Sequence, residues 1–569
     1  MNPRARLIRV ARGLEPADLI LSNARVVNVF NGEIERANIA VCDGRIAGIG
    51  NYTLAGETID LKQQYVLPGL IDGHTHVESS MLSIGEYARA VVPHGTLGVV
   101  TDLHEIANVS GIKGINSILK GARTLPFEFF VMAPPCVPAT GLETSGASLD
   151  AEALSRLLNN RNVIGLGEMM NYPGVLASDP AVLEKIKAAG RSPVDGHAPG
   201  LGGFDLAGYV ASGITSDHEC TTLEEAREKL ALGMYIMIRE GSTEKNLEDL
   251  LPLVTDKTYK RCLFVVDDRS CSDLLNDGDI DAVARKAIRL GLDPVRAIQL
   301  VTVNAAERFG LKGIGALAPG YLANIVVMQD LQKFEASLVF HRGLLVARDG
   351  KALFNPGKIT RARPAGSFKV KPFSAGALGL KSTRDTFPVI GVVPGQIITR
   401  KLDAAIARDM EGFVQADPKR DISKLVVVER HEGTGNIGRG LVKGFGLKRG
   451  ALASSVAHDS HNVVAVGTND ADIFAAVSEV IYMNGGMAVV ENGKVLARLN
   501  LPISGLMSDQ PVGEVVKDFE RLERSARALG TKLAAPFSVL SFMALPVIPE
   551  IRLTDMGLVD VASFSFMDP

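Results

Sequence analysis

The sequence predicts an α/β protein built around a parallel (β/α)8 barrel, with a small β-sandwich formed from both flanks and a C-terminal α+β domain. Three observations lead to this prediction. Eight short apolar runs alternate with helix-like stretches in the central region. Segments with strand-like alternation and hairpin turns precede and follow this region. A stretch rich in proline, glycine and basic residues then separates it from the remainder of the chain.

The two β segments flank the central region. In the first, apolar and polar residues alternate, and the dipeptide Asp43-Gly44 is typical of a hairpin turn. A similar alternation returns in GALAPGYLANIVVMQD and SLVFHRGLLVARDGK. We therefore expect both segments to pair into one β-sandwich, made of residues 1–66 and 313–362.

The central region carries the barrel prediction. Its apolar runs, in order, are VLPGLIDGHTH, LGVVTDLHE, FFVMAPPC, VIGLGE, PVDGH, GITSDH, YIMIRE and CLFVVDD. Continuously apolar strands that alternate with helices are typical of a parallel sheet covered on both faces. We assign residues 67–312 to a barrel, and an open doubly wound sheet is the alternative.

The C-terminal region follows a predicted linker, NPGKITRARPAGSFKVKP. Strand-like runs such as LVVVER and MAVVENGKVLARL are mixed there with helix-like runs such as DADIFAAVSEVIYMN. We assign residues 363–569 to a separate α+β domain.

Composition excludes several classes of function. The chain has 569 residues, a net charge of −3 and acidic and basic residues mixed throughout, so it lacks the basic surface that nucleic acid or an anionic membrane requires. Its five cysteines form no C-x-x-C pair, which argues against a disulfide framework and a thiolate zinc site. No 18 apolar residues run together. We expect a cytoplasmic protein with a small-molecule partner.

Polar residues end the apolar runs, and in a barrel such residues face one shared site. Five of the ten histidines fall on predicted strands one, two, five and six, all at the same end. The candidate residues are His74, His76, Asp102, His104, Glu105, Glu168, His197, His218, Glu219, Arg239, Glu240, Asp267 and Asp268.

This placement indicates a metal site. One residue separates His74 from His76, so both imidazoles project from the same face of an extended segment. Glu168 can span two ions with its two oxygens, and His197 and His218 would complete the second ion. Imidazole and carboxylate ligands suit zinc, manganese or iron.

Structural alternatives exist for individual residues. His104 can be a hydrogen-bonded structural histidine. Glu105, Glu219 and Glu240 can accept helix N-terminal N–H groups or pair with Arg239. The joint placement of the other histidines therefore carries the metal prediction.

The pattern resembles the amidohydrolase superfamily, through H-x-H on strand one, a carboxylate on strand four, histidines on strands five and six and an aspartate on strand eight. Within it, the blocks GHTHVESSMLS, TDLHEIANVSG, GLGEMMNYPGV, DGHAPGL, GITSDHECTT, LGMYIMIREGS and HDSHN resemble the bacterial adenine deaminase family over nearly the whole chain. Leu103 departs from the proline expected in TDPHE but alters no ligand. Glu168 stands where many hydrolases of cyclic amides have a carbamylated lysine.

The resemblance implies hydrolytic deamination of adenine to hypoxanthine and ammonia by a metal-bridging hydroxide. Asp267 would bind a metal and transfer the proton, although the adjacent Asp268 leaves the strand-eight ligand ambiguous. Glu219 and Glu240 are candidates to protonate the purine ring.

The resemblance also implies cofactors and partners. We expect two divalent ions, manganese or iron ahead of zinc. Asp102 and His104 are candidates either for a third ion or for orienting the other ligands. The partners are adenine and water, and we expect a homo-oligomer. The residues assigned to substrate binding are Glu78, Arg239, His458 and His461.

Two other functions remain open at this point. The first is hydrolysis of another cyclic amide or aminopurine by the same metals. The second is a non-catalytic assembly protein on the same barrel, for which loss of metal ligands would be expected.

Overall fold

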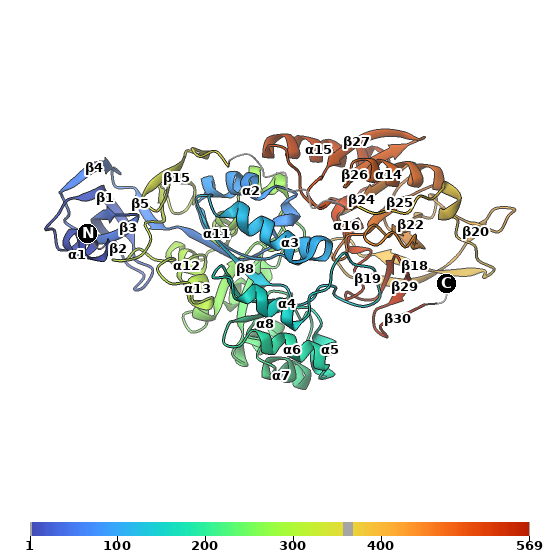
Figure 1. Cartoon of the computed structure of the whole chain (residues 1–569), viewed down its shortest axis with the longest axis horizontal. Helices are drawn as coiled ribbons and strands as arrows, with labels where there is room; N and C mark the ends of the chain where they lie inside the picture. The colour runs from blue at the N-terminus through green and yellow to red at the C-terminus, as the bar shows by residue number, and fades with distance from the viewer. Residues whose placement is uncertain (1–2, 357–367, 568–569) are drawn as a thin grey trace.

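The computed structural model describes residues 3–356 and 368–567. Figure 1 shows three regions in a row: an N-terminal sheet, a central region of strands and helices, and a C-terminal region. The predicted boundary at 362/363, and most of the predicted linker, lie outside the described residues. Among the residues described, no helix combines the length and apolar character needed to cross a membrane.

The N-terminal region is one nine-stranded sheet that both flanks of the central region build. Strand β14 pairs with β5 in antiparallel register, with Val327 opposite Val66, so the two segments meet in one sheet. The sheet is mixed rather than wholly antiparallel, because β4 and β5 both run parallel to β1. The strands are β1 (Ala17–Val27), β2 (Ile34–Cys42), β3 (Arg45–Gly50), β4 (Ala55–Asp60), β5 (Tyr65–Pro68), β14 (Ile325–Met328), β15 (Ala336–His341), β16 (Leu344–Arg348) and β17 (Lys351–Ala352).

Each of the eight apolar runs of the central region forms a parallel strand. These strands form a five-stranded sheet and a three-stranded sheet, which approach each other at two places. At the first, between β10 and β11, Thr215 N–H donates to the carbonyl of Val194 at 3.1 Å. At the second, between β13 and β6, Asp267 N–H donates to the carbonyl of His74 at 3.0 Å. The strands are β6 (Leu70–Thr75), β7 (Thr96–Asp102), β8 (Glu128–Ala133), β9 (Val163–Met169) and β10 (Val194–Gly196), then β11 (Ser216–Asp217), β12 (Tyr235–Arg239) and β13 (Cys262–Val265).

Helices follow the strands and cover their outer side. Asp150 caps α4 by accepting Ala153 N–H, and the Thr222 side chain caps α8 by accepting Glu225 N–H. Helix α3 begins at His104, directly after β7, so its first turn lies at the strand's carboxyl end. The helices include α2 (Ile84–Val91), α3 (His104–Ala122), α4 (Ala151–Leu158), α6 (Pro180–Ala188), α7 (Gly203–Ala211), α8 (Leu223–Ala231), α11 (Ile280–Arg289), α12 (Pro294–Leu300) and α13 (Val303–Arg308).

The C-terminal region is an eight-stranded sheet with helices on both faces. Val426 and Val428 of β22 pack with α14 (Asp470–Tyr482), whereas Leu425 and Val427 face the core shared with the barrel and α15 (Val512–Ala528). The strands, in sheet order, are β19 (Thr399–Ala405), β18 (Thr386–Val392), β23 (Ile437–Lys443), β22 (Ile422–Val428), β25 (Val463–Gly467), β24 (Ala451–Ser454), β26 (Gly486–Glu491) and β27 (Lys494–Asn500).

The C-terminal region packs directly on the central region. Ser508 N–H donates to the carbonyl of Met81 at 2.8 Å, and Val512 N–H donates to the Glu86 carboxylate at 2.9 Å. The loop after β24 and the short helix α16 (Pro536–Phe542) belong to this contact surface. This arrangement brings C-terminal side chains to the carboxyl ends of the central parallel strands.

Candidate metal centre and its cavities

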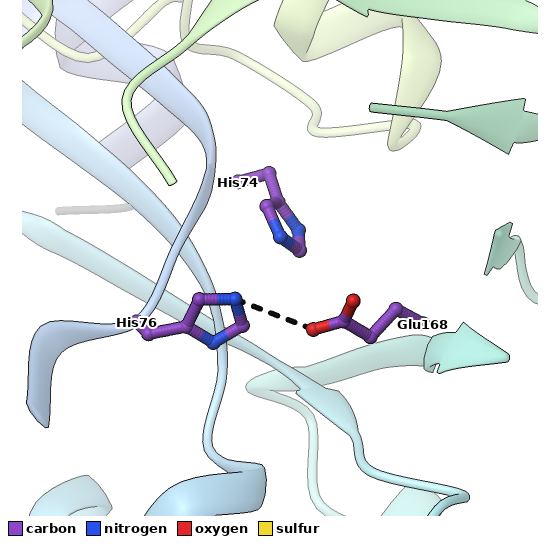
Figure 2. A group of neighbouring side chains, drawn as sticks. All are labelled: His74, His76 and Glu168. Atoms are coloured by element: carbon purple, nitrogen blue, oxygen red, sulfur yellow. Dashed lines mark ion pairs between the residues drawn. The ribbon is translucent and has the colours of Figure 1, made fainter. Parts of the chain in front are cut away.

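His74 and His76 lie at the end of β6 and face the same space. Figure 2 shows both imidazoles turned toward the Glu168 carboxylate, with the ion pair from His76 drawn. His76 Nε2 lies 3.3 Å from Glu168 Oε1. All three side chains are almost fully buried. The alternation of an extended segment therefore places both imidazoles on one site, as the H-x-H spacing predicts.

Glu168, at the end of β9, lies between two groups of histidines. His197 Nδ1 is 2.7 Å from its Oε2, and His218 Nε2 is 3.4 Å from the same oxygen. Its other oxygen, Oε1, lies 3.3 Å from both His76 Nε2 and His104 Nδ1. One carboxylate thus presents a different oxygen to each group.

Asp267 enters the same cluster from the residues after β13. Its Oδ1 lies 3.1 Å from His76 Nε2 and 3.6 Å from His74 Nε2. Its backbone has φ of +60°, a left-handed conformation that costs energy in most residues and is often retained at functional sites. The neighbouring Asp268 instead accepts a hydrogen bond from Ser79. Asp267 contacts both His74 and His76, and Asp268 also lies close enough to form a candidate ligand group with His76 and Asp267.

The donor set fits divalent cations. Two triads share Glu168, and within each triad the ligand atoms lie within 4.8 Å of one another. His74 Nε2 and Glu168 Oε1 are buried without a hydrogen-bond partner among the described residues, as expected for atoms that ligate an ion. The triads are His74, His76 and Glu168, and Glu168, His197 and His218; a third group comprises His74, His218 and Asp267.

Arg239, at the end of β12, supplies positive charge beside the cluster. It donates to both oxygens of Glu219, and to Asp267 Oδ2 at 2.9 Å. Burial alone would raise the pKa of Glu219, but Arg239 and His197 outweigh burial and hold that pKa well below its usual range. Glu219 therefore stays ionised at neutral pH.

Three of the predicted site residues, Glu240, Glu78 and Asp102, use their carboxylates for other contacts. Glu240 pairs with Lys286 at 2.5 Å and accepts Leu247 N–H, so it does not face the cluster. Glu78 accepts Ile106 N–H at 3.1 Å, and burial raises its pKa to about 7. Asp102 accepts Glu168 N–H at 2.8 Å, so it supports the strand that carries Glu168.

The C-terminal histidines reach the barrel through Glu105. His458 and His461 both form ion pairs with the Glu105 carboxylate. On the other side, His104 Nε2 lies 3.3 Å from Glu105 and 3.8 Å from Asp459. Asp459 was not among the predicted residues.

Two cavities adjoin beside the cluster, and only the inner one is lined by the clustered residues. The inner cavity, of about 40 Å³, is lined by the clustered histidines and carboxylates and by residues of the C-terminal region. The outer cavity, of about 720 Å³, lies between the barrel and that region. Sequence reasoning missed Glu244, Ile397 and Phe542, which line both cavities. Ile397 and Phe542 have ordinary side chains in a different domain, so no local motif indicates them.

Comparisons with known proteins match two family models. Residues 65–346 match the Amidohydrolase family, and residues 396–565 match the Adenine deaminase C-terminal domain. The chain is 60% identical to an adenine deaminase of Dehalococcoides mccartyi, covering 99% of this chain and 98% of that protein. It is 48% identical to adenine deaminase 2 of Carboxydothermus hydrogenoformans, with 99% of each chain covered. It is 47% identical to an adenine deaminase of Methanothrix thermoacetophila, with 98% of each covered.

Proposed function

The chain belongs to the adenine deaminase family of amidohydrolases, and from that membership we propose how its buried cluster deaminates adenine. It is a hydrolase that converts adenine to hypoxanthine and ammonia. The observation that carries the proposed mechanism is the position of Glu168 between two histidine groups. The alternative function, hydrolysis of a cyclic amide, is not favoured, because the three relatives described above are all named adenine deaminases.

The proposal extends to the barrel and its cofactors. The family implies divalent metal binding. We assign two ions to the triads that share Glu168, with manganese or iron as the native metal and zinc as the remaining candidate. The eight parallel strands act as one closed barrel, because hydrogen bonds span both seams between the two sheets.

The bound ions would make a water molecule nucleophilic near neutral pH. Asp267 accepts the proton of the attacking water and passes it to the departing amine, since its Oδ1 faces the cluster. Arg239 holds the other oxygen of Asp267 and thereby fixes the direction of the carboxylate. Glu219 anchors Arg239. Because Glu219 stays ionised and Glu240 faces away, we assign neither as the acid for the purine ring.

An assay with matched substrates tests this function. Metal-loaded protein should release ammonia from adenine and should leave hydantoin and dihydroorotate intact. Other aminopurines, tested in the same panel with manganese, iron and zinc in turn, define the substrate range. Absence of ammonia release from adenine with all three metals would overturn the proposal, and ring opening of hydantoin would favour the cyclic amide alternative.

A further inference from the structure

The inner and outer cavities share part of their lining. The residues common to both are Glu244 and Asp268 of the barrel, and Ile397, His458 and Phe542 of the C-terminal region. We call these five residues the constriction. Because they line both cavities, the constriction lies between the inner cavity at the metal cluster and the larger space outside it. Three of its five residues come from the C-terminal region.

The inner cavity is too small to contain a purine. Its volume of about 40 Å³ is well below the roughly 150 Å³ of a cavity that holds a benzene ring. Adenine has ten non-hydrogen atoms in a rigid, flat ring system. If its amino-bearing carbon lies beside the cluster, the rest of the base must extend into the constriction. Side chains of the constriction would therefore contact the substrate.

The aromatic part of the constriction is held in place before substrate arrives. The rings of His458 and Phe542 are stacked, with centroids 4.5 Å apart and planes 18° apart. His458 is in turn fixed by its ion pair with Glu105 at the start of α3. Phe542 ends α16 and is only partly buried, as expected for a ring that borders a cavity. Preorganised aromatic surface of this kind binds a flat base at low entropic cost.

We propose that adenine binds across the constriction with its ring system against Phe542, so that the C-terminal domain forms part of the substrate site. This inference rests on the proposed adenine deamination. Ile397 lines the same constriction, and the carboxyl groups of Glu244 and Asp268 lie on the barrel side, where they can hydrogen-bond the nitrogen edge of the base.

The test compares two phenylalanines of one helix. Phe542→Ala removes the ring at the constriction, whereas Phe537→Ala removes a ring of α16 that lines only the outer cavity. With metal-loaded protein, Phe542→Ala should raise KM for adenine by about 10-fold and raise the inhibition constant of the product hypoxanthine similarly. The kcat should change much less, because a ring contact stabilises ground state and transition state alike. Phe537→Ala should leave both constants near the wild-type values.

A conservative variant distinguishes loss of the ring contact with adenine from a folding defect. Phe542→Tyr keeps an aromatic face and should restore KM to within about 2-fold of wild type, whereas a merely structural defect would lower kcat and metal content as well. The inference is overturned if Phe542→Ala and Phe537→Ala give the same KM, or if the loss appears only in kcat. Failure of the wild-type protein to deaminate adenine would instead overturn the proposed function.

Discussion

Arg239 donates a hydrogen bond to Asp267 Oδ2 at 2.9 Å, while Oδ1 of the same carboxylate lies 3.1 Å from His76 Nε2. Each oxygen of Asp267 therefore has a separate partner. The fixed guanidinium determines the direction in which the other oxygen points. This relationship links Arg239, which is not a proposed metal ligand, to the carboxylate that we propose transfers the proton.

Replacing Arg239 tests that link. Arg239→Lys keeps a positive charge but loses the planar fork that reaches Glu219 and Asp267 together. We expect kcat for adenine to fall by about 100-fold, comparable to the loss of one oriented hydrogen-bond donor in an active site. Metal content, measured on the same preparation, should stay near that of wild type. A variant with unchanged kcat would contradict the role given to Arg239.

The adjacent aspartates provide a paired comparison. Asp267→Asn should abolish measurable turnover and reduce metal content, because the cluster loses an ionised oxygen. Asp268→Asn should retain more of the metal, since Asp267 pairs with both His74 and His76 whereas Asp268 accepts a hydrogen bond from Ser79. Elemental analysis of both purified variants gives the answer. Equal metal loss in the two variants would show that the strand-eight assignment is wrong.

Glu168→Gln removes the negative charge that lies between the two histidine groups. We expect activity to fall by at least about 1,000-fold, because the two ions would lose their common ligand. Glu86→Gln is the matched control, since Glu86 is also buried but accepts the Val512 N–H at the domain contact. An active Glu168→Gln enzyme would show that Glu168 does not bridge the ions.

Glu128 lies away from the metal centre, and we expect its ion pairs to make the stability of the fold depend on pH. Burial alone would raise its pKa, but His341 and Arg342 outweigh burial and lower that pKa from 4.5 to about 2. The folded state thus binds this proton less readily than the unfolded state. The resulting stabilisation, about 2 kcal/mol after allowance for the exposed Arg342, is complete above pH 4.5 and disappears as the pH falls toward 2.

Glu128→Gln should therefore have a Tm a few degrees below wild type at neutral pH. The difference between the two Tm values should shrink as the pH falls below 4.5. Thermal unfolding of wild type and Glu128→Gln in parallel, from neutral pH down toward pH 2, measures this difference in Tm. A difference that stays constant with pH would show that the ion pairs of Glu128 do not stabilise the fold.

The barrel part of the site was predictable because it depends on local rules. His74 and His76 share a face through strand alternation, and Glu168 ends an apolar run in the same way as the other strand-end residues. The choice between Asp267 and Asp268 was not predictable, since it depends on a left-handed backbone at Asp267 that alternation does not anticipate.

The C-terminal contribution could be predicted only in part. HDSHN was visible as a polar segment, but its pairing with Glu105 joins residues 353 positions apart and depends on how two domains pack. Phe542 carries no local signal at all, because a phenylalanine at the end of a short helix is usually a core residue. The parallel course of β4 and β5 beside β1 likewise depends on chain crossings that local alternation does not specify.

The most direct test of the central claim is a metal titration of chelator-stripped protein, with hypoxanthine formation from adenine as the readout. The stripped protein should be inactive, and activity should rise with added manganese or iron to a plateau at two equivalents per chain, because we propose that Glu168 is the common ligand of two ions. Full activity in the stripped protein, or a plateau at one equivalent, would contradict the account.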